Sequence, residues 1–176
     1  MKRLRNFLLY ALLFVVALMI LTPKVNLYYL FEEQMAPYGV VVDGEQLKDR
    51  GLCLEIGDAT LYAKGIDSAT AERISVKLFG LYNRIAVENT QLATAFTKFF
   101  PSEITHIEVT HAVWNPTNVI VNATGDFGSA NAVISLLERS VTARVTPSEL
   151  MKKRFGSTLR KLKKDETGGY RYETRF

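Results

Sequence analysis

The side chains best suited to chemistry are few and widely separated in this chain of 176 residues. The two histidines, His106 and His111, are five residues apart in a segment expected to be a strand. An odd separation places them on opposite faces of that strand, so one metal ion cannot easily bind both. Cys53 is the only cysteine and cannot form an internal disulfide or a cysteine-based metal cluster. The sequence therefore predicts no metal site and no cofactor.

Motifs that accompany catalysis are missing or isolated. Asp126-Phe127-Gly128 spells the magnesium-binding triplet of protein kinases, but no other kinase motif accompanies it. Neither a nucleophile elbow nor a glycine-rich phosphate loop occurs. Gly125 and Gly128 are instead expected to form a turn or a bulge between strands. We therefore predict no catalytic residue. An enzyme with an unrecognised site ranks below the two non-enzymatic hypotheses given at the end of this section.

A basic cluster near the C-terminus is the most distinctive surface feature. Residues 146–164 are expected to form one amphipathic helix that begins with Pro147 in its first turn. Its apolar face consists of Met151, Phe155, Leu159 and Leu162. The C-terminal basic cluster consists of Lys152, Lys153, Arg154, Arg160, Lys161, Lys163 and Lys164. Such a surface can bind anionic lipid or an acidic partner; alternatively, the helix packs on a sheet and leaves its charges in water.

Residues 1–24 are expected to form a cytoplasmic tail and a single transmembrane helix. The run from Phe7 to Leu21 holds 15 residues without a charge, and its flanks extend it toward the roughly 20 residues that a spanning helix needs. Basic residues precede the run, which places the N-terminus in the cytoplasm and the main domain across the membrane. The membrane-spanning side chains include Phe7, Leu8, Leu9, Leu12, Leu13, Phe14, Val15, Val16, Leu18, Ile20 and Leu21.

Two alternatives to this signal anchor stay open. A cleaved signal peptide shares the basic start and the apolar run, but residues from Met19 to Leu21 are too large for a small-x-small cleavage site. A buried core helix is the other alternative. The anchor reading predicts a single-pass protein of the bacterial inner membrane whose main domain is periplasmic.

Residues 25–37 are expected to form a short membrane-proximal helix. Leu27, Leu30 and Phe31 share a helical face, and Tyr28 and Tyr29 would lie near the headgroup layer, which aromatic rings favour. Either this helix lies in the membrane interface, or it packs on the following domain and caps its sheet.

Residues 38–176 are expected to form a β-rich domain of eight or nine short strands. Apolar and polar residues alternate in most of this region, most clearly in residues 71–81. Turns are expected at Asp43-Gly44, Gly57-Asp58, Gly65, Asp67-Ser68, Asn115-Pro116 and between Gly125 and Gly128. Residues 94–100 suit a short helix, and residues 170–174 suit a final strand.

Tight turns between successive strands indicate antiparallel neighbours. The predicted fold class is therefore mainly β: a transmembrane helix, a short entry helix, a curved antiparallel β-meander and a C-terminal amphipathic helix. Helices would cover the apolar side or the ends of this sheet.

Charge excludes one class of partner. The net charge is +4, and three positive charges, those of Lys2, Arg3 and Arg5, lie in the first five positions. That leaves +1 for the rest of the chain, too little to predict a basic nucleic-acid-binding face.

The order of elements resembles a known family. The segment LTPKVNLYYLFEEQMAPYGVVVDG is similar to the membrane-exit segment of the type II secretion system protein N family and the related AsmA-like proteins. VIVNATGDFGSANAVISL resembles the strand-glycine-strand pattern late in their domains. The resemblance implies a non-enzymatic inner-membrane protein whose periplasmic β-domain supports an envelope-spanning secretion assembly or handles lipid.

Two functional hypotheses follow. The first is a structural component of an envelope-spanning machine of the secretion, pilus, DNA-uptake or flagellar type, which binds other envelope proteins. The second is a periplasmic domain that binds or transports a lipid or another hydrophobic molecule in an apolar groove. A scaffold would cover its apolar sheet face with its own helices, whereas a groove would leave more than a few hundred Å² of contiguous apolar surface.

Overall fold

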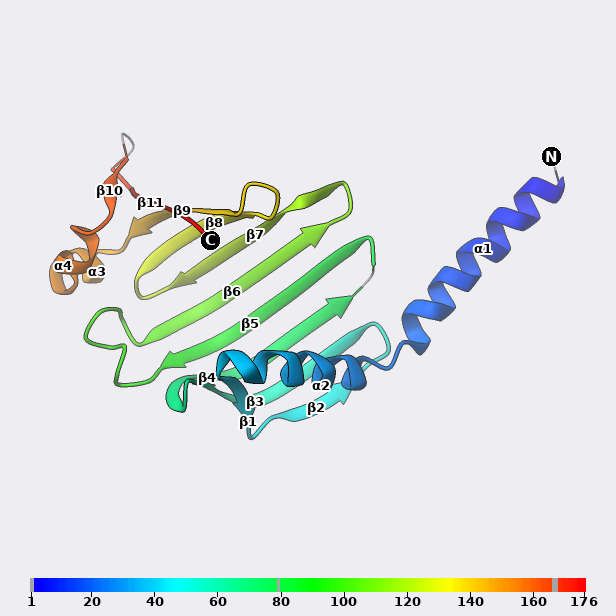
Figure 1. The fold of residues 1–176 in the computed structure, drawn as a ribbon, viewed down its shortest axis with the longest axis horizontal. Helices are drawn as coiled ribbons and strands as arrows, with labels where there is room; N and C mark the ends of the chain where they lie inside the picture. The colour runs from blue at the N-terminus through cyan, green and yellow to red at the C-terminus, as the bar shows by residue number, and fades with distance from the viewer. Residues whose placement is uncertain (1, 79, 166–167) are drawn as a thin grey trace.

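The computed structural model describes residues 2–78, 80–165 and 168–176 (Figure 1). It begins with α1 (Lys2–Leu21), which projects from the rest of the molecule, and continues after Pro23 with α2 (Lys24–Met35). Proline lacks an amide hydrogen and separates the two helices. The side chain of Lys24, 2% exposed, donates to the carbonyl oxygens of Met19 at 3.1 Å and Thr22 at 3.2 Å. These bonds satisfy carbonyls at the end of α1 and fix the junction.

The predicted fold class is confirmed: the sheet is antiparallel, open and curved. It has eleven strands within the described residues, more than the eight or nine expected. They are β1 (Val40–Asp43), β2 (Gln46–Asp49), β3 (Cys53–Ala63), β4 (Ile66–Leu78), β5 (Tyr82–Leu92), β6 (Glu103–Ala112), β7 (Asn115–Gly125), β8 (Gly128–Ser135), β9 (Ser140–Pro147), β10 (Lys163–Lys164) and β11 (Tyr170–Arg175).

Strands β3 to β9 follow one another across the sheet in chain order, and β11 and then β10 follow β9. The expected hairpin at Asp43-Gly44 is wrong, because β1 and β2 both pair with β3 instead of with each other. A two-residue hairpin of the common type needs positive φ at both central residues. Of these two residues, only Gly44 has a positive φ, +74°. The chain therefore does not reverse there, and β1 and β2 pair one after the other with β3.

The expected turn at Gly57-Asp58 is also wrong, because β3 runs through it without a break. Asp58 adopts a φ of +53°, and Asn89 in β5 adopts +52°. These residues interrupt the regular alternation of side chains, so Ala59 is buried on the same side as Ile56. The sequence signal for a turn therefore marks a kink inside a long strand.

Other turns are partly as expected. Gly65 and the Gly125–Gly128 pair lie at hairpin turns. The break expected at Asp67-Ser68 lies inside β4, and the turn expected at Asn115-Pro116 falls two residues earlier, since both residues belong to β7. Residues 94–100 form hydrogen-bonded turns rather than a helix.

The expected C-terminal helix is shorter and divided. Ser148 caps α3 (Glu149–Arg154) by accepting a hydrogen bond from the amide of Met151. A second short helix, α4 (Gly156–Leu159), follows the break at Phe155. Glycine at its first position favours the break because of its backbone freedom. Lys163 and Lys164, predicted as helical, form β10 instead.

The hydrophobic core is small and lies under α2. Leu54 and Ile56 of β3, each 2% exposed, pack against Val25 and Tyr28 of α2.

 Ala59, 3% exposed, completes this cluster. This confirms that the entry helix packs on the domain. Val25 and Tyr28 make this contact, whereas Leu27, Leu30 and Phe31, which share the predicted helical face, are 40–63% exposed.

Candidate hydrophobic binding face

Strand register divides the sheet into an apolar and a polar face. Paired residues share a face, as do residues two apart along a strand. Starting from Ile56 beneath α2, the pairs lead through Ile74, Val87 and Ile107 to β7, β8 and β9. We define the apolar face by the aliphatic residues that this path reaches in β5 to β9: Ile85, Val87, Ile107, Val109, Val119, Val121, Ala123, Ala130, Ala132, Ile134, Val141, Ala143 and Val145. Asn83 and His111 lie on the same face near the ends of β5 and β6.

The helices leave the apolar face largely open. None of its thirteen residues is buried, whereas Leu54 and Ile56 beneath α2 are each 2% exposed. The short helices α3 and α4 lie at the far end of the sheet (Figure 1). There Ser148 donates to the carbonyl of Asp126, and Thr158 donates to the carbonyl of Phe99. The two ends of the chain therefore supply helices to the edge and the end of the sheet, and little covers its centre.

Element dimensions explain why coverage is incomplete. Strands lie about 4.8 Å apart, so the ten strands that follow one another in the sheet extend about 43 Å. A helix is about 10 Å across, and the 12 residues of α2 extend about 18 Å. One such helix covers only a few strands.

The total surface agrees with an open architecture. The solvent-accessible area is 12327 Å². A compact monomer of 19.8 kDa is expected to expose about 8,600 Å². Both the projecting helix α1 and the uncovered sheet contribute to this excess.

The opposite face is mainly polar, with Ile120 and Val133 exposed on it, and it carries cross-strand ion pairs. Arg84 of β5 contacts Glu108 of β6 at 2.8 Å, between guanidinium nitrogen and carboxylate oxygen. Asn131 donates to Asn122 across β7 and β8 at 2.7 Å. Pairs of this kind stabilise neighbouring strands by a few tenths of a kcal/mol to about 1 kcal/mol each. This face needs no covering layer, because water solvates its side chains.

The histidines lie on opposite faces of β6, as their spacing predicts. His106 shares the polar face with Glu108, and the two side chains approach to 3.6 Å. His111 lies within 3.2 Å of the carbonyl oxygen of Pro116. Within residues 2–78, 80–165 and 168–176, no group of three or more metal-ligating side chains comes together. Cys53 is a half-buried free thiol.

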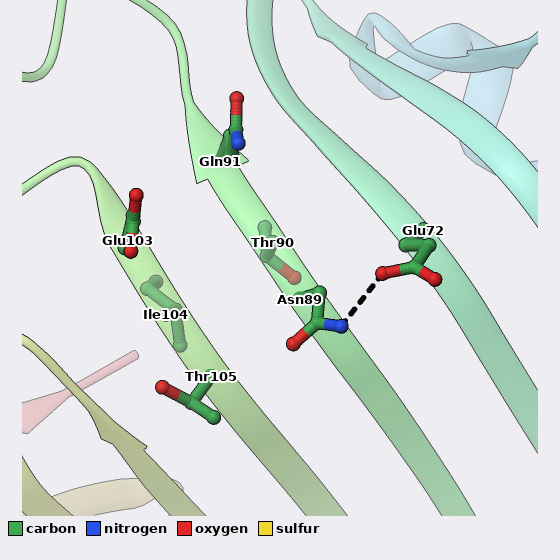
Figure 2. Close-up of a pocket in the computed structure, with 7 residues that line it drawn as sticks. All are labelled: Glu72, Asn89, Thr90, Gln91, Glu103, Ile104 and Thr105. Carbon is green, nitrogen blue, oxygen red and sulfur yellow. Dashed lines mark hydrogen bonds between the residues drawn. The ribbon is translucent and has the colours of Figure 1, made fainter.

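A polar pocket of about 280 Å³ is lined by residues of β4, β5 and β6 (Figure 2), close to Asn89, whose φ is +52°. Its side chains include Glu72, Asn89, Gln91 and Glu103, and Asn89 donates to Glu72 at 2.6 Å. Thr90 and Ile104 project behind the strands, away from these polar groups (Figure 2). This pocket can accept hydrogen bonds, but it lacks an apolar lining of the kind that buries a small ligand.

The C-terminal basic cluster is exposed but does not form one helical surface. Three members, Lys152 to Arg154, lie on α3, and Lys152 pairs with Glu149 at 2.9 Å. The other four lie after α4 or in β10. Met151 and Leu159 are buried at 1% and 2% exposure, which confirms that these short helices pack their apolar side on the protein.

The residues predicted to span a membrane all lie in α1 and are exposed. This helix is long and apolar enough to cross a membrane, and a signal sequence shares these properties. Its lack of burial excludes the buried core helix as an explanation of the apolar run. Comparison with known proteins adds no assignment: no protein-family model, curated protein or solved structure matches the chain.

Sequence reasoning identified the apolar strand positions but did not show that they stay open. The lengths of the expected helices already indicated that part of the sheet stays open. The expected helices after the membrane segment are too short to cover eight or nine strands, which are about 4.8 Å apart.

Proposed function

We propose that this chain is a non-enzymatic, single-pass protein of the bacterial inner membrane whose periplasmic sheet binds the hydrocarbon part of a lipid. In this proposal α1 spans the membrane with its basic N-terminus in the cytoplasm, as the positive-inside rule favours. The open apolar face receives the ligand. No catalytic step is part of the proposed function.

The observation that carries the proposal is the open apolar face. Thirteen aliphatic residues on five adjacent strands remain partly exposed, with no charged residue among them. Soluble monomers rarely expose contiguous apolar patches larger than a few hundred Å². Burial of such a surface is favourable by about 25 cal/mol per Å², so a hydrophobic ligand would stabilise the domain.

Side-chain size favours a narrow aliphatic ligand. Ala130 on β8 lies opposite Ala123 on β7 and Val145 on β9, and Ala132 lies opposite Val121 and Ala143. Larger residues, Val121 and Val145, flank this group. The small side chains lower the part of β8 before Ile134, and in this proposal the acyl chain lies along that part.

A second candidate function is an assembly component that binds another envelope protein, such as a secretion, pilus, DNA-uptake or flagellar component. The specific observation in its favour is the sheet edge. Within the described residues, β10 pairs only with Tyr170 and Arg171, so the outer edge of β11 beyond them is unpaired. An exposed edge can receive a strand from a partner. The resemblance to the type II secretion protein N and AsmA-like families supports both candidates.

Purification in a gentle detergent, followed by mass spectrometry of lipids and proteins, separates the two candidates. Because α1 retains boundary lipid in any case, the comparison needs matched variants. Val121→Glu places a charge on the apolar face, and Asn122→Glu places it on the polar face one residue away. We expect Asn122→Glu to retain the lipid of the wild type and Val121→Glu to lose part of it. A stoichiometric envelope protein with equal lipid in all three samples would support the assembly component instead.

A further inference from the structure

Large apolar residues occupy the turns at one end of the sheet. Because adjacent strands are antiparallel, the β2–β3, β4–β5, β6–β7 and β8–β9 turns all lie at the same end, where β11 also ends. We call the exposed apolar residues at this end the rim. The rim consists of Leu52, Leu81, Val113, Trp114, Leu136, Leu137 and Phe176.

The rim residues are strongly exposed. Their exposed fractions extend from 41% for Leu52 to 78% for Leu137, and Trp114 is 71% exposed. Turns normally carry glycine, proline and small polar residues. Leucine and tryptophan at the tips of separate hairpins contribute nothing to the core, so their presence at one end needs another explanation.

Two turns of the rim, β2–β3 and β4–β5, lie beside the end of α1, and the β6–β7 and β8–β9 turns follow along the same end of the sheet (Figure 1). A Cβ atom placed on Gly51, next to Leu52, would lie 3.9 Å from Cγ2 of Ile20. A Cβ atom on Gly80, next to Leu81, would lie 3.9 Å from Cε of Met19. Met19 and Ile20 belong to the apolar run of α1. If that run lies in the membrane, the turns beside it lie at the boundary between acyl chains and headgroups.

We propose that the rim is a second membrane-binding site, which inserts into the interface of the same bilayer that α1 spans. This inference rests on the proposed membrane span of α1. Figure 1 shows α1 leaving the sheet in roughly the direction in which the strands run. In this proposal the strands run roughly perpendicular to the membrane plane, and the apolar face begins at the bilayer surface.

A bilayer fits the rim better than a protein partner does. Tryptophan is enriched at membrane interfaces because its ring is apolar and its indole N–H is polar. Trp114 stacks on Tyr82 with ring centroids 6.0 Å apart, so two amphipathic rings lie together at this end. The opposite end also carries exposed apolar residues, Ile66 and the three phenylalanines of the 93–102 loop. That loop lies beside α4, whereas two turns of the rim lie beside the apolar run of α1.

Trp114 is the only tryptophan and therefore reports on the rim directly. The full chain is reconstituted in nanodiscs of ordinary or brominated phosphatidylcholine, and tryptophan emission is compared. We expect brominated lipid to quench Trp114 and expect its emission to be blue-shifted relative to that of an exposed tryptophan in water. The matched control, Trp114→Phe with Tyr38→Trp, places the probe at an exposed site at the opposite end and should show no quenching.

A third variant separates failure of the rim from failure of the anchor. Trp114→Phe with Tyr10→Trp places the probe within α1. Quenching at position 10 without quenching of Trp114 would overturn the rim proposal and leave the anchor intact. Absence of quenching at position 10 would overturn the membrane span and the rim proposal together.

A charge variant tests whether the rim residues themselves drive insertion. Leu136→Glu with Leu137→Glu should reduce the quenching of Trp114, because glutamate resists entry into the interface. Ile66→Glu at the opposite end serves as the matched control and should leave the quenching unchanged. Circular dichroism verifies that both variants fold. Undiminished quenching in a folded Leu136→Glu, Leu137→Glu variant would contradict the assignment of these residues to the membrane contact.

Discussion

Replacement of Val121 by threonine measures whether the apolar face is open. Threonine has nearly the shape and the strand propensity of valine, so the change mainly adds a hydroxyl group. On an open face water solvates this group, and we expect a loss of less than about 0.5 kcal/mol in the free energy of unfolding. On a covered face the unpaired hydroxyl would cost about 1–3 kcal/mol.

Ile56→Ala provides the reference for a covered position. Ile56 is 2% exposed beneath α2, and truncation of a buried isoleucine costs about 2–5 kcal/mol. The structure therefore predicts a large difference between two apolar residues that share one face of one sheet. Part of the difference comes from the larger truncation at Ile56, and the rest comes from α2, which covers β3 and leaves β7 open.

Urea unfolding of the full chain in detergent, followed by circular dichroism, supplies both free energies. The protein is first stripped of lipid by detergent exchange, because a ligand bound to the folded state would add to the apparent stability. A loss for Val121→Thr as large as that for Ile56→Ala would refute the open face. It would show that another layer, such as a second copy of the chain, covers β7.

Three further predictions concern other parts of the fold. Gly125→Ala should destabilise the protein by more than about 1 kcal/mol in urea unfolding, because a Cβ atom there would lie 2.6 Å from the carbonyl oxygen of Glu103, whereas the control Gly156→Ala meets no atom within 4 Å. Reversal of the last four charges of the C-terminal basic cluster to glutamate should leave the melting temperature nearly unchanged, since these side chains are exposed; a collapse would show a structural role. Burial, with Glu45 and Glu32 nearby, raises the pKa of Tyr28. Its neutral form is favoured in the fold, so stability should fall as pH rises above about 10, and the fall should be smaller in Tyr28→Phe.

Local sequence patterns predicted most strands because alternation is itself a local property. Residues 71–78, for example, alternate Ile74 and Val76 with Arg73 and Ser75, and the structure places them in β4. The two short strands before β3 show the limit of this reasoning. Asp43-Gly44 predicts a reversal locally, but pairing of both flanking segments with β3 decides the chain path. Such a long-range choice cannot be read from four residues.

The candidate site was predictable only in part. Alternation identified the apolar residues, but their exposure depends on how much of the sheet the helices cover. The division of the C-terminal helix at Phe155 and Gly156 removed part of the expected cover. The sequence did not predict the rim, because its exposed apolar residues are distributed over separate turns. Only the order of the strands brings Leu81, Trp114 and Leu137 to one end.

Site-specific photocrosslinking in the native membrane tests lipid binding by the apolar face most directly. A photoreactive amino acid replaces Val121 in one sample and Asn122 in the other, and intact-protein mass spectrometry identifies the adducts. The proposed function predicts a lipid adduct at position 121 and none at position 122, since these neighbours lie on opposite faces of β7. A protein adduct alone at position 121, or equal lipid labelling at both positions, would contradict it.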